Sequence, residues 1–284
     1  MTTLVTGASG HFGRLTIEAL LARGVAPGEL RAGTRRPHEL ASLSARGVAV
    51  VPLDYDDDAS VASAVEGADQ VLLVSGNELG KRVAQHAVVI TAAAKAGVGH
   101  LVYTSAPRAD DTSLVIVPEH AATERLLADS GLTATILRNN WYLENYAATV
   151  AQVRETGVLL TSAGDGRVAS ALRSELAEAA AVVLTTEEHR GRTIELGGDE
   201  AWTFAEFGAA LGTVLGREVT VEQLSAEEHL ARLTAAGLDE GTAGFVVAVD
   251  GNIREGALEG GTHDLSVLLG RPTATLPDAL ATLV

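Results

Sequence analysis

The sequence predicts an α/β protein with a doubly wound parallel sheet and a smaller C-terminal α/β lobe. Short apolar runs alternate with segments of helical spacing over the first half of the chain, as in sheets whose strands are joined by crossover helices. A glycine-rich turn separates the first apolar run from the first helical segment. The alternation ends near residue 140, so we expect one domain over residues 1–140 and a second lobe over residues 141–284, partly interlaced with the sheet.

The elements of the first domain follow from periodicity and composition. Apolar, strand-like runs lie at residues 4–5, 30–33, 48–51, 70–74, 100–104 and 133–137. Helical spacing is clearest at residues 14–23, 83–95 and 119–129. The connections are long enough for right-handed crossovers, so we expect a six-strand order of the 3-2-1-4-5-6 type.

The second half of the chain has a less regular pattern. It begins with a segment over residues 141–156 in which the strict alternation is lost, and continues with a loop around Gly164–Gly166, a helix over 174–185 and a strand over 193–196. A helix beginning at 202–204, a short strand over 218–221 and a capped helix over 225–236 come next. We expect one of these segments to return and extend the sheet.

Composition narrows the possible functions. The chain has 284 residues, of which 46% are hydrophobic, with no apolar run long enough to cross a membrane. Its first five residues lead directly into the glycine turn, which leaves no room for a signal peptide and favours a cytoplasmic protein. Cysteine is absent and no H-E-x-x-H pattern occurs, so we expect no disulfide, thiolate or metal site. A net charge of −16 disfavours nucleic acid and anionic membranes as partners.

The glycine turn has the sequence T-G-A-S-G-H-F-G between a strand and a helix. Glycines at this spacing allow the backbone to approach a pyrophosphate, whose charge meets the free N–H groups at the helix N-terminus. The alternative is a tight turn without a ligand. We expect phosphate contacts from Gly7, Ser9, Gly10, His11, Phe12 and Gly13.

The end of the second strand indicates which dinucleotide is bound. NAD-selective folds carry an acidic residue there, whereas this chain has Arg35 and Arg36. Two guanidinium groups suit a 2′-phosphate and favour NADPH over NADH. NADH remains the alternative if both arginines are solvated surface charges. Asp54 is a candidate adenine contact, and Ser75 and Gly76, after the fourth strand, are candidates for close approach to the cofactor.

Two common chemistries are excluded by the residues present. Reduction by a Tyr-x-x-x-Lys pair requires a lysine four positions after a tyrosine, and none of the four tyrosines has one. Hydrolysis at a nucleophile elbow requires G-x-S-x-G, which is also absent. Any reductase activity must therefore work without a tyrosine–lysine dyad.

The chain resembles the NmrA-like atypical short-chain dehydrogenases, and within them the type-2 NAD(P)H:quinone oxidoreductases and the triphenylmethane reductases. The resemblance covers nearly the whole chain and rests on residues 6–13, 34–37, 54–55, 103–105, 119–124, 137–142, 163–166, 201–203 and 268–273. It implies a Rossmann domain, a small C-terminal lobe and direct hydride transfer from NAD(P)H to a flat, conjugated acceptor without flavin.

Cofactor positions carry over from the family to Gly7, Gly10, Gly13 and Arg35. The chain departs from the family pattern at three places. An asparagine usual after the arginine is Arg36, the usual glutamine–leucine pair is His11–Phe12, and a serine-rich stretch is Ser75-Gly76-Asn77. These changes put the phosphate contacts and the shape of the acceptor site in doubt, whereas the added charge favours a 2′-phosphate.

Candidate acceptor residues lie at or just beyond the carboxyl ends of the fifth and sixth strands. Their hydroxyl and amide groups are placed to hydrogen-bond a developing oxyanion, or else serve as turn and cap residues; they are Thr104, Ser105, Asn140 and Tyr142. His120 is a candidate proton donor, or forms a surface pair with Glu124 on one helix face. Trp141 either covers a planar substrate or belongs to the core.

Three functions fit these observations. The first is a quinone or dye reductase, and the second is a tailoring enzyme that reduces an anthraquinone-like aromatic polyketide before hydroxylation. The third is an NmrA-like redox sensor that binds NAD(P) without catalysis and regulates a protein partner. A homo-oligomer is compatible with each of them, because any amphipathic helix can face solvent or a second subunit.

Overall fold

The computed structural model of the protein describes residues 1–110, 114–260 and 262–284. The chain divides into two compact units. The first unit contains Met1–Asp110, Ile116–Asn139 and Arg173–Glu195. The second contains residues 140–172 and 196–284, together with a short piece that ends at Val115. Each unit is described by itself below.

A seven-stranded sheet forms the centre of the first unit, with the order β3-β2-β1-β4-β5-β6-β8. All five strand pairs from β3 across to β6 are parallel. The predicted α/β class and six-strand order are therefore confirmed, with β8 added beside β6. The strands are β1 (Thr3–Val5), β2 (Leu30–Thr34), β3 (Ala49–Pro52), β4 (Gln70–Leu73), β5 (His100–Ser105), β6 (Ala134–Asn139) and β8 (Thr193–Leu196).

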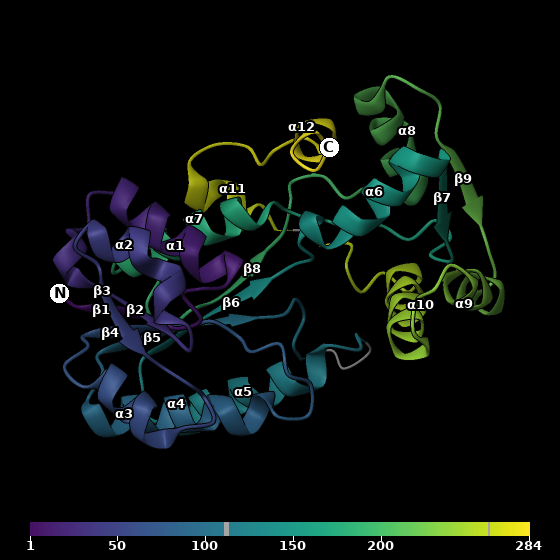
Figure 1. Cartoon of the computed structure of the whole chain (residues 1–284). Coiled ribbons are helices and arrows are strands. Elements are labelled where there is room, and N and C mark those ends of the chain that lie inside the picture. Colours follow the sequence, from purple (N-terminus) through teal and green to yellow (C-terminus); the bar gives the residue numbers. More distant parts are fainter. Residues whose placement is uncertain (111–113, 261) are drawn as a thin grey trace. The chain divides into compact units, whose positions relative to one another are not determined.

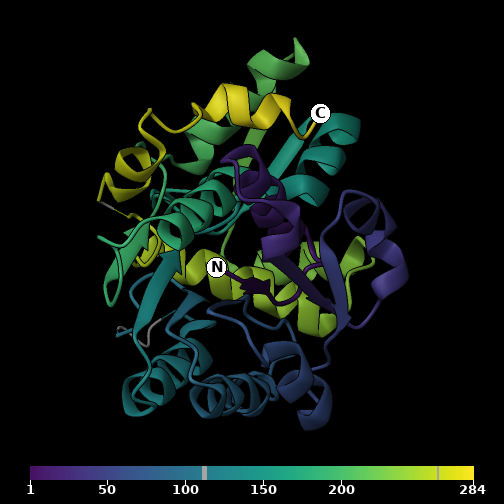
Figure 2. The same ribbon diagram turned by 90° about the vertical axis from the view of Figure 1, so that its left-hand side faces the viewer.

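Helices cover both faces of this sheet (Figure 1). On one face α1 (His11–Ala22) packs against α7 (Arg173–Thr185), and on the other α4 (Arg82–Ala96) packs between α3 (Asp58–Val65) and α5 (Val117–Asp129). Figure 2 shows the latter three, in blue to teal, as a row along one side of the strands. Central strand residues such as Leu4, Val71 and Leu101 are fully buried, because a parallel sheet is covered on both faces. The remaining helical pieces are short: η1 (Pro27–Glu29), η2 (Pro37–Leu40) and α2 (Ala41–Ala45).

The segment that returns to the sheet is α7 with β8. The Gln70 side chain on β4 donates a 2.9 Å hydrogen bond to the carbonyl of Leu184, at the end of α7. The Ile136 N–H on β6 donates to the carbonyl of Arg192 just before β8. Residues 173–195 therefore belong to the first unit although they follow residue 140 in the chain.

The second unit combines a two-stranded sheet with helices. Its parallel strands β7 and β9 pair over four positions. The sequence does not predict β7, and β9 begins two residues after its predicted start. The helices after residue 240 have no counterpart in the prediction. The elements are η3 (Leu143–Tyr146), α6 (Ala147–Thr156), β7 (Val158–Thr161), α8 (Phe204–Leu215), β9 (Thr220–Gln223), α9 (Ala226–Ala235), α10 (Glu240–Arg254), α11 (Asp264–Leu269) and α12 (Leu276–Ala281).

Local sequence signals explain two helix starts in the second unit. Thr203 and Ser225 each accept a hydrogen bond from the backbone N–H of a glutamate three residues later, whose side chain bonds back to the capping residue. This reciprocal capping satisfies donors that the first helical turn leaves open. Within the described ranges, no helix combines the length and apolar character needed to cross a bilayer.

Close backbone packing makes Gly166 a site where substitution should destabilise the second unit. A Cβ atom there would lie 2.3 Å from the carbonyl oxygen of Ile253, so Gly166→Ala should lower the free energy of unfolding by about 2–4 kcal/mol. Gly244, within α10, has open space around its Cβ position. Gly244→Ala is the matched control and should raise stability by about 0.5–1 kcal/mol through helix propensity. Urea unfolding monitored by circular dichroism measures both; equal midpoints for the two variants would contradict the packing argument.

Candidate functional site

The glycine turn after β1 is built by close approach of its own backbone. Gly7 has φ +58°, a left-handed conformation that favours glycine. A Cβ on Gly13 would lie 2.6 Å from the carbonyl oxygen of Gly7, so a side chain there would push α1 away from the turn. The Gly10 N–H donates a 2.9 Å hydrogen bond to the same carbonyl. These three glycines therefore bring the N-terminus of α1 against the carboxyl end of β1.

The N-terminus of α1 faces outward without a side-chain cap. Gly10 is its N-cap residue and is exposed. A helix leaves its first N–H groups without intrahelical partners, and these attract an anion. Ser9 lies beside this end and accepts a 2.8 Å hydrogen bond from the Thr34 hydroxyl at the end of β2. Of the two residues that depart from the family pattern, His11 is exposed and Phe12 is buried, so the Phe12 side chain serves the core rather than the phosphates.

Arg35 and Arg36 project from the end of β2 into solvent. Their side chains are 57% and 58% exposed, and they form ion pairs with Glu78 at 3.4 Å and Glu39 at 2.9 Å. Exposed pairs of this kind contribute little stability, so both guanidinium groups can exchange their carboxylate for a phosphate at small cost. Asp54 forms a local turn by accepting a 3.2 Å hydrogen bond from the Asp56 N–H.

Tyr55 connects the ends of β1 and β4, a role that the sequence analysis missed. Its hydroxyl donates to the Val74 carbonyl at 2.8 Å and lies 2.5 Å from the Thr6 hydroxyl oxygen. Thr6 in turn accepts a 3.0 Å hydrogen bond from the Val74 N–H. Because the Tyr55 proton goes to Val74, the Thr6 proton must point to Tyr55. Removal of solvent raises the pKa of Tyr55, so its hydroxyl keeps this proton.

This connection lies where the order of the sheet reverses. Strands β2 and β3 extend from one side of β1, and β4, β5 and β6 extend from the other. In open α/β sheets, ligands bind outside the carboxyl ends of the strands at such a reversal. The glycine turn and the Ser75–Gly76 loop both begin at this reversal, and we call the region that they border the crevice. Its glycine positions and uncapped helix end fit a dinucleotide.

The Ser75–Gly76 loop after β4 is held by side chains of neighbouring elements. The Ser75 N–H donates a 2.8 Å hydrogen bond to the Thr104 hydroxyl on β5. The Gly76 N–H donates to His86 Nε2 at 3.0 Å, and its carbonyl accepts from Arg82 Nε at 2.6 Å. Space for a Gly76 side chain is limited by Gln85, whose Oε1 would lie 3.2 Å from the Cβ. The glycine therefore allows the loop to pack on α4.

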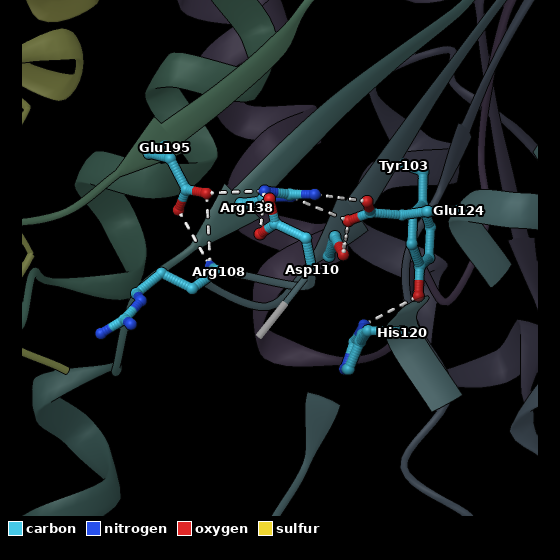
Figure 3. Close-up of polar contacts among 8 residues, drawn as sticks. Tyr103, Arg108, Asp110, His120, Glu124, Arg138 and Glu195 are labelled. Carbon is cyan, nitrogen blue, oxygen red and sulfur yellow. Dashed lines mark hydrogen bonds and ion pairs between the residues drawn. The ribbon is translucent and has the colours of Figure 1, made fainter. Parts of the chain in front are cut away.

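Ser105 is hydrogen-bonded to an ion-pair network at the ends of β5 and β6. Figure 3 labels the four charged residues of this network, Asp110, Glu124, Arg138 and Glu195. Its hydroxyl donates a 2.5 Å hydrogen bond to Glu124, which also binds Arg138 at 2.8 Å. Arg138 further contacts Glu195 and Asp110. The hydroxyl of Ser105 therefore offers an acceptor rather than the donor expected for an oxyanion.

His120 does not form the predicted surface pair with Glu124. It is buried, and its Nδ1 lies 2.8 Å from the Tyr103 hydroxyl, whereas Glu124 turns to Arg138 (Figure 3). Burial, with Arg82 and His86 nearby, lowers the pKa of His120 to about 3. The surface-pair alternative is wrong because α5 packs this histidine against β5. Over the described part of the chain, no cluster of three histidine, aspartate or glutamate side chains suits a metal ion.

The other three predicted acceptor residues belong to the second unit. Asn140 is buried, and its amide is used by the chain: Oδ1 accepts from the Trp141 N–H at 2.7 Å and Nδ2 donates to the Leu258 carbonyl. Trp141 is partly exposed, while its indole Nε1 atom is buried and meets no partner among the described residues. Tyr142 is partly exposed and bridges to Ala171. The Asn140 amide therefore holds the backbone of Trp141 and Leu258 in place. Trp141 and Tyr142 are the more accessible side chains of the three.

Comparisons with known proteins show the family to which the chain belongs. A family model described as NAD(P)H-binding matches residues 7–187. Quinone oxidoreductase 2 of Escherichia coli is 40% identical over 98% of this chain and 96% of its own length. A (4-alkanoyl-5-oxo-2,5-dihydrofuran-3-yl)methyl phosphate reductase of Streptomyces griseus is 32% identical over 97% and 95% of the two chains.

Two solved structures extend the similarity to three dimensions. The Escherichia coli quinone oxidoreductase in complex with NADPH gives a TM-score of 0.95 at 40% identity, covering 99% of both chains. The Citrobacter triphenylmethane reductase in complex with NADP(H) also gives 0.95, at 32% identity and full coverage. The glycine turn, the crevice and these matches together show that the chain belongs to the NAD(P)H-binding family, among the NmrA-like atypical short-chain dehydrogenases that its motifs indicate.

Proposed function

We propose that the protein is an NADPH-dependent reductase that transfers a hydride, without flavin, to a quinone or a similar planar conjugated acceptor. The observation that carries this proposal is the crevice at the β1–β4 reversal, with an uncapped helix end on one side and two loosely paired arginines after β2. The similarity to quinone oxidoreductase 2 over 98% of the chain supports the acceptor class.

In this proposal, the residues of the crevice bind the dinucleotide and orient its nicotinamide ring. Backbone N–H groups of the glycine turn hold the pyrophosphate, and Arg35 with Arg36 holds the 2′-phosphate. When bound, the nicotinamide supplies the hydride. The Ser75–Gly76 loop, fixed by Thr104, His86 and Arg82, limits where the reacting ring can lie. Correct placement of two reactants alone supplies a large part of a rate enhancement.

A strong catalytic acid is unnecessary for this class of acceptor. Hydride addition to a quinone gives an aromatic anion that is stabilised by resonance and takes a proton from water. The ionisable side chains behind the loop are poor proton donors, since burial lowers the pKa of His120 and raises that of Tyr103. We therefore assign His120 a structural role, and we assign acceptor contacts to Trp141 and Tyr142.

A redox sensor and a polyketide-tailoring enzyme remain the alternatives. Nucleotide binding without turnover of any acceptor would favour the sensor. Turnover restricted to anthraquinone-like substrates would favour tailoring, whereas activity on small benzoquinones and naphthoquinones favours the general reductase. The same acceptor panel therefore separates all three.

Arg35→Ala should weaken NADPH selectively. Loss of one charge-assisted contact to the 2′-phosphate should raise the KM for NADPH by about ten-fold, with the KM for NADH little changed. Steady-state oxidation of each nucleotide with a benzoquinone or naphthoquinone acceptor, and no added flavin, measures this. Arg46→Ala is the matched control, because Arg46 is also exposed and paired, with Glu18 at 2.7 Å. An equal effect of both variants, or of Arg35→Ala on both nucleotides, would contradict a 2′-phosphate site.

The rate of hydride transfer should be insensitive to pH around neutrality. A histidine with a lowered pKa is already neutral at pH 6 and stays neutral as the pH rises, so His120 contributes no ionisation near its ordinary value of about 6.5. Stopped-flow single turnovers from about pH 6 to 9 should give a flat profile. If an inflection near pH 6.5 appears and His120→Gln removes it, His120 is the proton donor after all.

A further inference from the structure

The backbone N–H and the carbonyl of Gly76 are both bound by side chains of one helix. Its N–H donates to His86 Nε2 at 3.0 Å, and its carbonyl accepts from Arg82 Nε at 2.6 Å, both side chains lying one turn apart on α4. Arg82 is itself fixed by Glu119 of α5 at 3.1 Å. His86 is fully buried and Arg82 nearly so, so the contacts are shielded from competing water. The loop after β4 is thereby tied to α4 rather than to its own turn.

The hydrogen bonds define the proton on His86. A backbone N–H can only donate, so Nε2 must be unprotonated where it meets Gly76. The proton then lies on Nδ1, which is 3.0 Å from the Thr123 hydroxyl oxygen. Thr123 donates its own proton to the Glu119 carbonyl at 2.9 Å and is free to accept from Nδ1. The chain from Gly76 through His86 and Thr123 to Glu119 therefore has one donor and one acceptor at every contact.

The bound loop lies on the reactive side of the crevice. The glycine turn after β1 receives the pyrophosphate, and the arginines after β2 receive the 2′-phosphate end. The other half of a dinucleotide must then extend over β4 and β5. Ser75 and Gly76 follow β4 directly, so an error in their position displaces the nicotinamide rather than the adenosine.

We propose that His86, neutral and protonated on Nδ1, is a positioning residue that holds the Gly76 N–H and so fixes the nicotinamide side of the crevice. The proposal rests on the proposed function for the place of the nicotinamide and for its kinetic readout, whereas the proton on Nδ1 follows from the hydrogen bonds alone. Packing alone does not explain a histidine at position 86, because another ring or a branched side chain could make the same edge contacts to Tyr55 and Tyr103. The hydrogen bond from the Gly76 N–H, in contrast, requires an acceptor atom at the position of Nε2.

The tautomer is tested on the wild-type protein. Long-range proton–nitrogen correlation NMR at pH 7 distinguishes a protonated from an unprotonated ring nitrogen, and His86→Gln identifies the signal among the eight histidines. We expect His86 to be neutral with its proton on Nδ1. A proton on Nε2, or a charged ring, would overturn the proposal. This measurement requires no turnover, so it stands even if the reductase function fails.

Kinetics test the consequence of losing the acceptor. His86→Leu removes it and should lower kcat by about ten-fold or more, while the Kd for NADPH, measured by tryptophan fluorescence, rises less than three-fold because the phosphates bind elsewhere. His86→Gln places an amide oxygen near the position of Nε2 and should restore kcat to within about three-fold of wild type. An unchanged kcat in folded His86→Leu, or an equal loss in His86→Gln, would overturn the proposal.

His100 provides the matched control. It is also buried, and one of its ring nitrogens, Nε2, has a hydroxyl partner, Thr135 at 2.8 Å, as Nδ1 of His86 has Thr123. His100 begins β5, at the amino ends of the strands and so at the opposite end of the sheet from the Gly76 loop. His100→Leu should lower stability while keeping kcat within about two-fold. Equal losses of kcat in His100→Leu and His86→Leu would reduce the effect to general destabilisation and refute positioning. Absence of turnover in the wild type would refute the reductase function instead.

Discussion

The hydroxyl group of Tyr55 is the contact on which the crevice depends. It lies between the ends of β1 and β4 and bonds to Thr6 and Val74, while Thr6 receives the Val74 N–H in return. Polar groups at the end of a buried strand are costly when unpaired, so this closed set of three contacts stabilises one separation of the two strand ends. The glycine turn and the Ser75–Gly76 loop begin immediately beyond it. Their separation therefore follows from contacts made by Thr6, the first residue of the turn, and by Val74, the residue before the loop.

Local signals in the sequence predicted much of the fold, including the position of the glycine turn between its strand and its helix. The structure places the glycine turn, the strand before it and the helix after it as predicted. These features could be predicted because each depends mainly on residues that are neighbours in the sequence. Arg35 and Arg36 were singled out by the same kind of local signal, their position directly after β2, and their binding of a 2′-phosphate stays a prediction. Long-range contacts were not predictable in this way. Nothing near His86 in the sequence indicates that it contacts Gly76. The sequence likewise does not show that the Ser105 hydroxyl is bound by Glu124, because that contact exists only once α5 packs on the sheet.

The error over His120 has the same physical origin. A spacing of four residues places His120 and Glu124 near one another on a helix, and the sequence does not state which face the sheet covers. In the fold, β5 buries the histidine beside Tyr103, whereas Glu124 reaches Arg138 at the end of β6. The unpredicted strand β7 is a similar case, because a four-residue strand pairs with β9 more than fifty residues later and has no pattern of its own.

Under the proposed 2′-phosphate site, the pairing of Arg35 with Glu78 has a consequence for the release of the nucleotide. Glu78 belongs to the same loop as Gly76, and it loses this partner whenever a phosphate takes the guanidinium. Binding thus exchanges one anion for another at Arg35. The net free energy of binding is smaller than that of the new phosphate contact by the free energy of the lost ion pair, which is below about 1 kcal/mol because the pair is exposed. In the reverse direction the carboxylate competes with the departing phosphate. A protein that must discard an oxidised nucleotide after each turnover thus carries its own competitor for that phosphate, two residues along the chain from Gly76.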